Sequence, residues 1–205
     1  MNKKRMLPRG AGLLVALAFA IGVRGDAVDE IGRLATLMNW KPGTIAADIG
    51  AGDGSYSFAA AGRVGATGRV FATEIDKEKL QELRAQVQKR RLQNVTVIES
   101  KEGGTNLPTA CCDVIFLRHV YHHLTKPAEF DASLVRSLKP RARLAIIDFP
   151  PRPGLPDVKG VPSNREGHGI PQKVVIEELT AAGLKVEKVV EDWPEGSYCA
   201  VFVKY

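Results

Sequence analysis

The sequence predicts a doubly wound α/β domain with a mostly parallel seven-stranded sheet and an antiparallel C-terminal strand. Short apolar runs alternate with helical segments, and the runs are apolar throughout, as in strands that helices cover on both faces. The last two runs are joined only by residues 192–196, too few for a helical crossover, so they form an antiparallel hairpin. A chain of 205 residues is the size of one ordinary domain with at most a short appendage.

The strands are predicted where β-branched and apolar residues cluster between turn signals. The first precedes a glycine-rich turn, and the last two enclose the Asp192–Gly196 turn. In chain order the predicted strands are 44–48, 69–74, 94–99, 113–117, 143–148, 184–191 and 198–204.

The helices are predicted from apolar residues three and four positions apart and from Pro and Gly at helix ends. Val28, Ile31 and Leu34 define the face of the first helix, and Gly183 ends the last. The predicted helices are 27–38, 55–63, 77–91, 127–138 and 171–182.

The connection from Phe149 to Ile170 is rich in Pro and Gly and is longer than a plain connection requires. Long loops in compact domains often serve as lids over a site. We expect this segment to help form an acceptor pocket.

The N-terminus resembles a targeting segment that is separate from the domain. A basic stretch, residues 2–9, precedes thirteen uncharged residues, 11–23, a run too short for a comfortable membrane span but suited to a secretory signal. We expect residues 1–25 to be a signal peptide or an N-terminal anchor and residues 26–205 to form the folded domain. Export or membrane attachment through residues 1–25 follows from this pattern, although a cytoplasmic location stays open.

The positive net charge does not predict nucleic-acid binding. The chain carries +6 overall, but five basic and no acidic residues lie within residues 1–25, which leaves +1 for the rest. A domain with so little net charge has no global field that attracts phosphates. We therefore expect no nucleic-acid partner.

The strongest chemical signal is the segment Asp48–Gly54 (DIGAGDG), between a predicted strand and a predicted helix. Ligands of open α/β sheets bind at the carboxyl ends of strands, where glycines let the backbone approach a ligand closely. Twenty residues after Gly54, Glu74 ends the second predicted strand, where a carboxylate can accept hydrogen bonds from ribose hydroxyls. Together they predict a nucleoside cofactor.

The spacing favours a cofactor without a pyrophosphate. Dinucleotide sites prefer G-x-G-x-x-G, whereas this sequence has G-x-G-x-G with Ser55 next. Asp48 would repel a phosphate at short range but attract an ammonium group. S-adenosylmethionine carries an ammonium, a carboxylate and a sulfonium and no phosphate, so its chemistry fits better.

These residues resemble the class I S-adenosylmethionine-dependent methyltransferases, in particular their small-molecule members. The resemblance covers roughly residues 27–205 and rests on residues 48–54, 73–76, 106–108 with 113–115, and 138–140, together with the terminal hairpin. It implies a Rossmann-like methyltransferase fold, S-adenosylmethionine as cofactor, and methyl transfer to a small-molecule acceptor.

The resemblance also assigns cofactor-binding residues. Residues 48–54 would surround the methionine moiety, Glu74 would hold the ribose, and Ile75 would lie against adenine. Family members often bind the adenine amino group with an acidic residue where this chain has Gly103 and Gly104. Either neighbouring Glu102 or backbone groups would substitute, or adenine would be held loosely. The implied cofactor-binding residues are Asp48, Gly50, Ala51, Gly52, Gly54, Glu74, Ile75 and Glu102.

The catalytic step needs little beyond alignment of the acceptor with the sulfur, unless the acceptor must lose a proton. His119, His122 and His123 follow the fourth predicted strand, and His168 lies in the long loop. Histidine titrates near neutrality, so we select His119 and His168 as candidate bases. The H-x-x-H-H spacing also suits metal ligands, but the sequence fixes no further ligand, and we expect no metal ion.

Two other functions stay open at this point. A non-catalytic module that binds S-adenosylmethionine or a partner would explain the missing adenine-binding acid. A nicotinamide-dependent oxidoreductase would use a similar sheet, but the chain has no Tyr-x-x-x-Lys pair. The sequence does not set the acceptor or the oligomeric state.

Overall fold

The structure, a computed structural model, describes residues 25–205 of the chain. The expected leader therefore lies outside the described residues except for Gly25, at which the first helix begins. Within residues 25–205, no helix is both long enough and apolar enough to cross a membrane. Export or anchoring through the leader stays a prediction.

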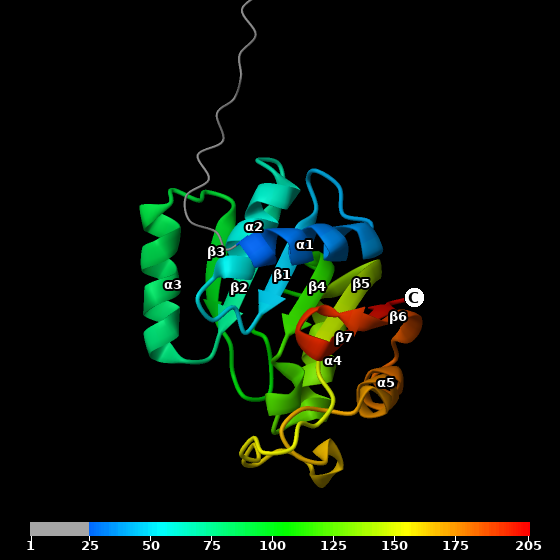
Figure 1. Cartoon of the computed structure of the whole chain (residues 1–205). Helices are drawn as coiled ribbons and strands as arrows, with labels where there is room; N and C mark the ends of the chain where they lie inside the picture. The colour runs from blue at the N-terminus through cyan, green and yellow to red at the C-terminus, as the bar shows by residue number, and fades with distance from the viewer. Residues whose placement is uncertain (1–24) are drawn as a thin grey trace, which may run out of the picture.

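The core of the domain is one seven-stranded sheet with strand order β3-β2-β1-β4-β5-β7-β6. Five strands run parallel to their neighbours, and β7 pairs antiparallel to both β5 and β6 (Figure 1). The predicted mostly parallel sheet with an antiparallel C-terminal strand is confirmed. The strands are β1 Ile45–Ile49, β2 Arg69–Glu74, β3 Val95–Glu99, β4 Cys112–Arg118, β5 Leu138–Asp148, β6 Lys185–Trp193 and β7 Ser197–Val203.

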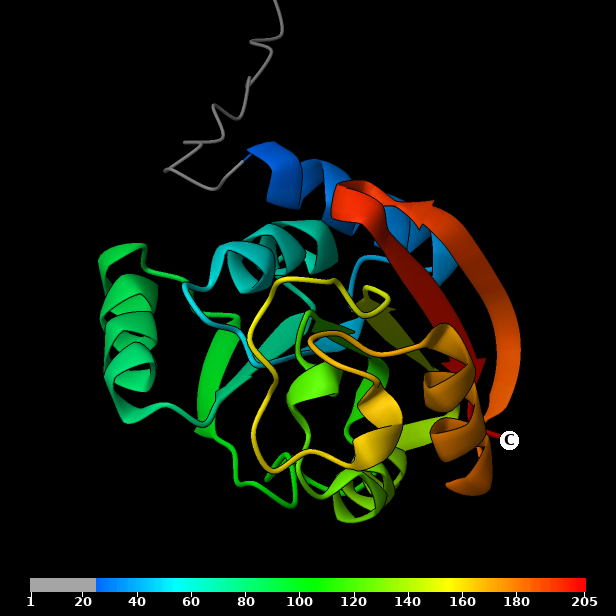
Figure 2. The same cartoon turned by 60° about the horizontal axis from the view of Figure 1, so that its bottom comes forward.

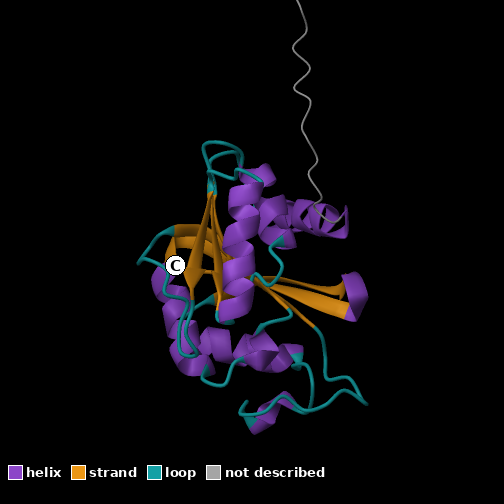
Figure 3. Ribbon diagram, turned by 90° about the vertical axis from the view of Figure 1, so that its left-hand side faces the viewer, coloured by secondary structure: helices purple, strands orange, loops and turns teal. Residues whose placement is uncertain are grey.

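Helices cover both faces of the sheet, as Figure 3 shows from the side. The first three pack on one face and the last two on the other, so the strands carry apolar residues on both sides. In β1, for example, Ala46 belongs to one core and Ala47 to the other. The helices are α1 Gly25–Leu37, α2 Ser55–Val64, α3 Lys77–Lys89, α4 Pro127–Ser137 and α5 Gln172–Ala181.

Strand β5 differs most from its prediction, because it begins at Leu138 rather than at residue 143. Leu138 pairs with Cys112, and the register then shifts before Val114 pairs with Arg143. The irregularity accommodates Pro140, which has no N–H to donate and is tolerated in sheets at bulges. Pro140, which we expected to lie just beyond the end of the helix 127–138, therefore lies inside β5.

The carboxyl ends of β1, β2 and β4 point to one end of the domain, where residues 149–170 lie across them (Figure 2). This long loop contains a short 3-10 helix, Ser163–Arg165. Its two ends meet, since Ile170 donates its backbone N–H to the carbonyl of Phe149 at 2.9 Å. The predicted lid segment thus lies over the edge at which the cofactor motif ends.

Candidate cofactor and acceptor site

The turn after β1 is built from glycines in the left-handed region. Gly50, Gly52 and Gly54 have φ values of 72°, 54° and 81°, which residues with a side chain rarely adopt. The N–H groups of Gly50 and Ala51 both donate to the carbonyl of Thr73, at 2.9 and 2.8 Å. The turn is thereby fixed against the end of β2.

Two of these glycines are also required by packing. A Cβ on Gly50 would lie 2.6 Å from Val120 Cγ2, and one on Gly54 would lie 2.5 Å from both Leu83 and Phe58. A Cβ on Gly52 would meet no atom within 4 Å. The backbone at Gly52 is therefore open to a ligand, while its neighbours are packed against the protein.

Glu74 binds this turn directly. One carboxylate oxygen accepts the N–H of Gly52 at 2.9 Å, and the other accepts those of Ile75 and Asp76 at 2.8 and 3.0 Å. The side chain is buried, but a carboxylate offers about four lone-pair sites, so one remains for a further donor. The structure thus brings the predicted ribose-binding acid and the glycine turn into contact.

Asp48 lies beneath the turn with only 2% of its surface exposed. Its carboxylate accepts the hydroxyl of Ser57 at 2.6 Å. Burial raises the pKa of Asp48 to about 7, with Glu74 and Asp53 adding negative charge nearby. A cation at the glycine turn would stabilise the ionised form, which is consistent with the ammonium that the sequence predicts there.

A cavity of about 210 Å³ opens beside the turn and contains three of the predicted cofactor residues, Gly50, Ile75 and Glu102. Its walls also include Val120 and His123. Typical ligand sites have volumes of about 300–1,000 Å³, so this smaller cavity fits part of a nucleoside cofactor. Its position next to Ile75 is where the resemblance places adenine.

Glu102 reaches this cavity with its carboxylate already engaged. Thr125 donates its hydroxyl to Glu102 at 2.6 Å, and the Lys126 ammonium lies 2.9 Å from the other oxygen. These two contacts lower the pKa of Glu102. An adenine amino group would therefore share this carboxylate with two existing donors.

His119, one of the two candidate bases, directly follows β4 and is half-buried. Its Nε2 lies 2.8 Å from Ser197 Oγ, and its Nδ1 lies 3.3 Å from an Arg118 nitrogen. Burial, followed by the charge of Arg118, lowers the pKa of His119. The imidazole is thus neutral near pH 7, but both of its nitrogens have protein neighbours.

His168, the other candidate base, lies in the 149–170 loop. Its Nδ1 is 2.8 Å from the carbonyl oxygen of Pro156, which can only accept. Nδ1 therefore carries a proton, and in the neutral ring Nε2 keeps a lone pair. The rings of His119 and His168 both pack on Phe149, with centroids 5.1 and 6.1 Å away, so the two bases lie on the same end of the sheet.

A charge network beside the turn was not predicted from the sequence. Arg118 Nε lies 3.1 Å from both oxygens of Glu30, which also accept the Tyr56 hydroxyl at 2.7 Å and the Trp193 indole N–H at 2.6 Å. The network links α1, α2, β4 and β6. One signal was present in the sequence, because Glu30 lies three residues after Ala27 and four before Leu34, on the apolar face of the first helix.

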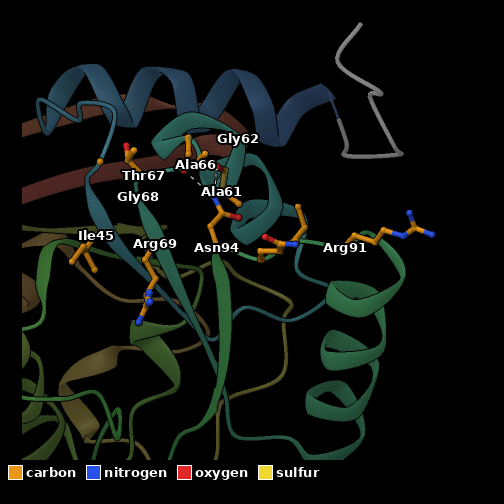
Figure 4. Close-up of a pocket in the computed structure, with 13 residues that line it drawn as sticks. Ile45, Ala61, Gly62, Ala66, Thr67, Gly68, Arg69, Arg91 and Asn94 are labelled. Atoms are coloured by element: carbon orange, nitrogen blue, oxygen red, sulfur yellow. Dashed lines mark hydrogen bonds between the residues drawn. The ribbon is translucent and has the colours of Figure 1, made fainter. Parts of the chain in front are cut away.

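A larger hollow, of about 780 Å³, lies at the opposite end of the sheet. Figure 4 shows it between the amino ends of β1 and β2 and the loop 65–68. Its lining is mostly small residues and backbone with Arg69 and Arg91, and it includes no acidic residue or histidine. None of the predicted site residues belongs to it.

Comparisons with known proteins concern the domain as a whole. Residues 47–146 match a family model described as a methyltransferase domain. A S-adenosylmethionine-dependent methyltransferase from Aquifex aeolicus is 28% identical, with a TM-score of 0.73 over 89% of this chain and 95% of that one. Two further structures share the fold at 13% identity each. The YcgJ protein from Bacillus subtilis has a TM-score of 0.65 over 88% of this chain and 99% of that one. The [4+2]-cyclase SpnF has a TM-score of 0.68 over 86% of this chain and 80% of that one.

The fold is a doubly wound α/β domain, and its candidate cofactor residues gather at the carboxyl ends of β1 and β2. The family model and the solved structure together support a class I S-adenosylmethionine-dependent methyltransferase, with S-adenosylmethionine as its cofactor. The predicted family, fold and cofactor are confirmed.

Proposed function

We propose that this protein transfers the methyl group of S-adenosylmethionine to a small-molecule acceptor. The observation that carries the proposal is the contact between Glu74 and the Gly52 N–H, at 2.9 Å. It joins the acidic end of β2 to the open glycine turn at the edge where residues 149–170 lie. A donor and an acceptor can therefore meet under one loop.

The residues present fit the cofactor. Gly52 leaves room for its methionine part, Glu74 retains acceptor capacity for the ribose, and the cavity beside Ile75 suits adenine. The sulfonium supplies an electrophilic methyl group, so the chain's own task is to hold the acceptor in line with it and exclude water. Asp48 beneath the turn offers negative charge to the cofactor's ammonium.

The acceptor pocket would lie under residues 149–170. Arg165 anchors this loop, because its buried guanidinium lies 2.7 Å from Glu178 and over the Tyr121 ring. Phe149 and the histidines beside it give the covered space an aromatic wall. Such a wall favours a small, partly apolar molecule over a nucleic acid.

Proton removal, where the acceptor requires it, would fall to His168 or His119. His168 Nε2 carries a lone pair, since its Nδ1 donates to Pro156. His119 is neutral near pH 7 and lies 2.8 Å from Ser197, which can orient it.

Incubation of the protein with methyl-labelled S-adenosylmethionine and a metabolite extract tests the proposal. We expect label in at least one low-molecular-mass product, and no label with a Glu74→Ala variant. Cofactor binding without any labelled product would instead favour a non-catalytic cofactor-binding module, which shares every contact described above. Absence of cofactor binding would contradict both.

A further inference from the structure

Three histidines from two separate segments form a cluster beside the cofactor cavity. His122 and His123 belong to the short 3-10 helix after β4 (Tyr121–His123), and His168 comes from the 149–170 loop. Their ring centroids lie 4.0 Å (122–123), 5.2 Å (122–168) and 5.7 Å (123–168) apart. One nitrogen from each can be chosen so that all three lie within 4.8 Å of one another.

His122 is held in one orientation by Asp148. The imidazole Nδ1 lies 2.8 Å from Asp148 Oδ1, and the backbone N–H of His122 donates to Oδ2 at 3.1 Å. A carboxylate accepts the proton of Nδ1, so in the neutral imidazole Nε2 bears the lone pair. This Nε2 is buried, in a residue only 1% exposed, and has no hydrogen-bond partner.

His168 has the same tautomer for a similar reason. Its Nδ1 donates to the carbonyl oxygen of Pro156 at 2.8 Å, which leaves the Nε2 lone pair for another ligand. Histidines that bind metals commonly donate their other ring N–H to a carboxylate or to a backbone carbonyl. Two of the three histidines thus have the supporting contacts of metal ligands.

We propose that His122, His123 and His168 bind a divalent transition-metal ion of the Zn²⁺ class, with Asp148 as a positioning residue. Neutral imidazoles are preferred ligands of such ions, and three protein ligands leave one coordination position open. An open coordination position is typical of catalytic rather than structural zinc sites.

The geometry requires a modest contraction on binding. Tetrahedral Zn²⁺ with nitrogens at about 2.0–2.1 Å places the ligand atoms about 3.4 Å apart. His123 is exposed and His168 lies on a loop, so both can rotate toward the buried His122. Phe149, packed on His122 and His168 with centroids at 4.8 and 6.1 Å, gives the site an apolar wall.

The position of the cluster suggests what the ion would do, on the basis of the function proposed above. His123 lines the same cavity as Gly50 and Ile75, so the ion would lie beside the bound cofactor. An acceptor hydroxyl or thiol bound at the open position would lose its proton more easily. Metal binding would use the His168 lone pair, so it excludes a role for His168 as free base.

Metal titration of the full chain, freed of any histidine tag and treated with chelator, tests the proposal. Without cofactor present, we expect Zn²⁺ to bind at one equivalent per chain with a dissociation constant of about micromolar or below, measured by calorimetry. Co²⁺ should give the visible absorption bands of a tetrahedral site. No binding, or bands of six-coordinate Co²⁺ only, would overturn the proposal.

Variants assign the ligands. His123→Ala and His168→Ala remove partly exposed side chains, and each should weaken Zn²⁺ binding at least about 100-fold with an unchanged far-UV circular dichroism spectrum. Asp148→Asn should weaken it by about 10- to 100-fold. His119→Asn is the matched control, since it follows the same strand but lies outside the cluster, and should change binding less than twofold.

The Zn²⁺-binding measurements can be distinguished from the test of methyl transfer. Unchanged Zn²⁺ binding in His123→Ala and His168→Ala would refute the site even if methyl transfer is observed. Conversely, Zn²⁺ binding lost in these variants but not in Glu74→Ala would support the site even if no acceptor is methylated.

Discussion

The two ends of the parallel sheet differ in cavity size and in the polar groups that surround each cavity. The amino end carries the larger hollow, about 780 Å³, and the carboxyl end the smaller cavity, about 210 Å³. Yet the carboxyl end gathers Glu74, Asp48 and all four histidines, whereas no acidic residue or histidine lines the hollow. We therefore place the candidate site by its convergent polar groups rather than by cavity volume.

The two ends should also differ in how strongly a glycine-to-alanine substitution changes the free energy of unfolding. Gly54→Ala should lower the free energy of unfolding by about 2–5 kcal/mol, because it combines left-handed strain with a clash against Leu83 and Phe58. Gly62→Ala, in α2 beside the hollow, meets no atom within 4 Å and should raise it by about 0.5–1 kcal/mol. Urea unfolding of both variants measures the contrast. Equal effects would mean that the turn tolerates side chains.

The buried carboxylate at the carboxyl end should make stability depend on pH. Because the pKa of Asp48 is raised to about 7 in the folded protein, its contribution is most favourable below the unfolded pKa and is lost as pH rises to about 7. From pH 5 to pH 8, the wild type should therefore lose on the order of 2–3 kcal/mol relative to Asp48→Asn. Asp131, whose pKa burial also raises to about 7, titrates in both proteins.

Thermal or urea unfolding across this pH range checks the difference between the two proteins. Parallel curves for wild type and Asp48→Asn would show that the Asp48 carboxylate is solvated or paired in the folded state.

Strand β2 runs from the hollow at the amino end to the candidate site at the carboxyl end. Substitutions of its first residue, Arg69, and its last, Glu74, therefore compare the two ends. Glu74→Gln at its carboxyl end should weaken S-adenosylmethionine binding by about 10- to 50-fold, because the amide loses the charge that accepts hydroxyl hydrogen bonds. Glu99→Gln, at the end of neighbouring β3 and exposed, is the control and should change affinity little. Calorimetry gives both values, and a similar loss in both variants would point to general electrostatics.

Arg69→Ala at the other end of β2 should have the smallest effect. The side chain is exposed and lines the large hollow, so we expect less than about a twofold change in cofactor affinity. Loss of cofactor binding in this variant, with Glu74→Gln unaffected, would move the site to the amino end.

Much of the cofactor site could be predicted because it is local in sequence. Gly50, Gly52 and Gly54 follow a strand directly, and Glu74 ends the next one, so parallel pairing brings them together without further information. The structure confirms this proximity, and the binding and catalytic roles of all the predicted site residues stay predictions. The network of Glu30, Arg118 and Trp193 was missed because its members lie up to 163 residues apart, and only packing brings them into contact.

The sequence by itself determined the order of strands and helices, the glycine turn and the acid that closes it, because hydrophobic periodicity and backbone restrictions act over short stretches of chain. Only the tertiary structure decided that His168 joins His122 and His123 while His119 does not. That choice depends on how the 149–170 loop folds back across the sheet. The fold of such a loop is set by long-range contacts, such as the one between Arg165 and Glu178, which no local pattern encodes.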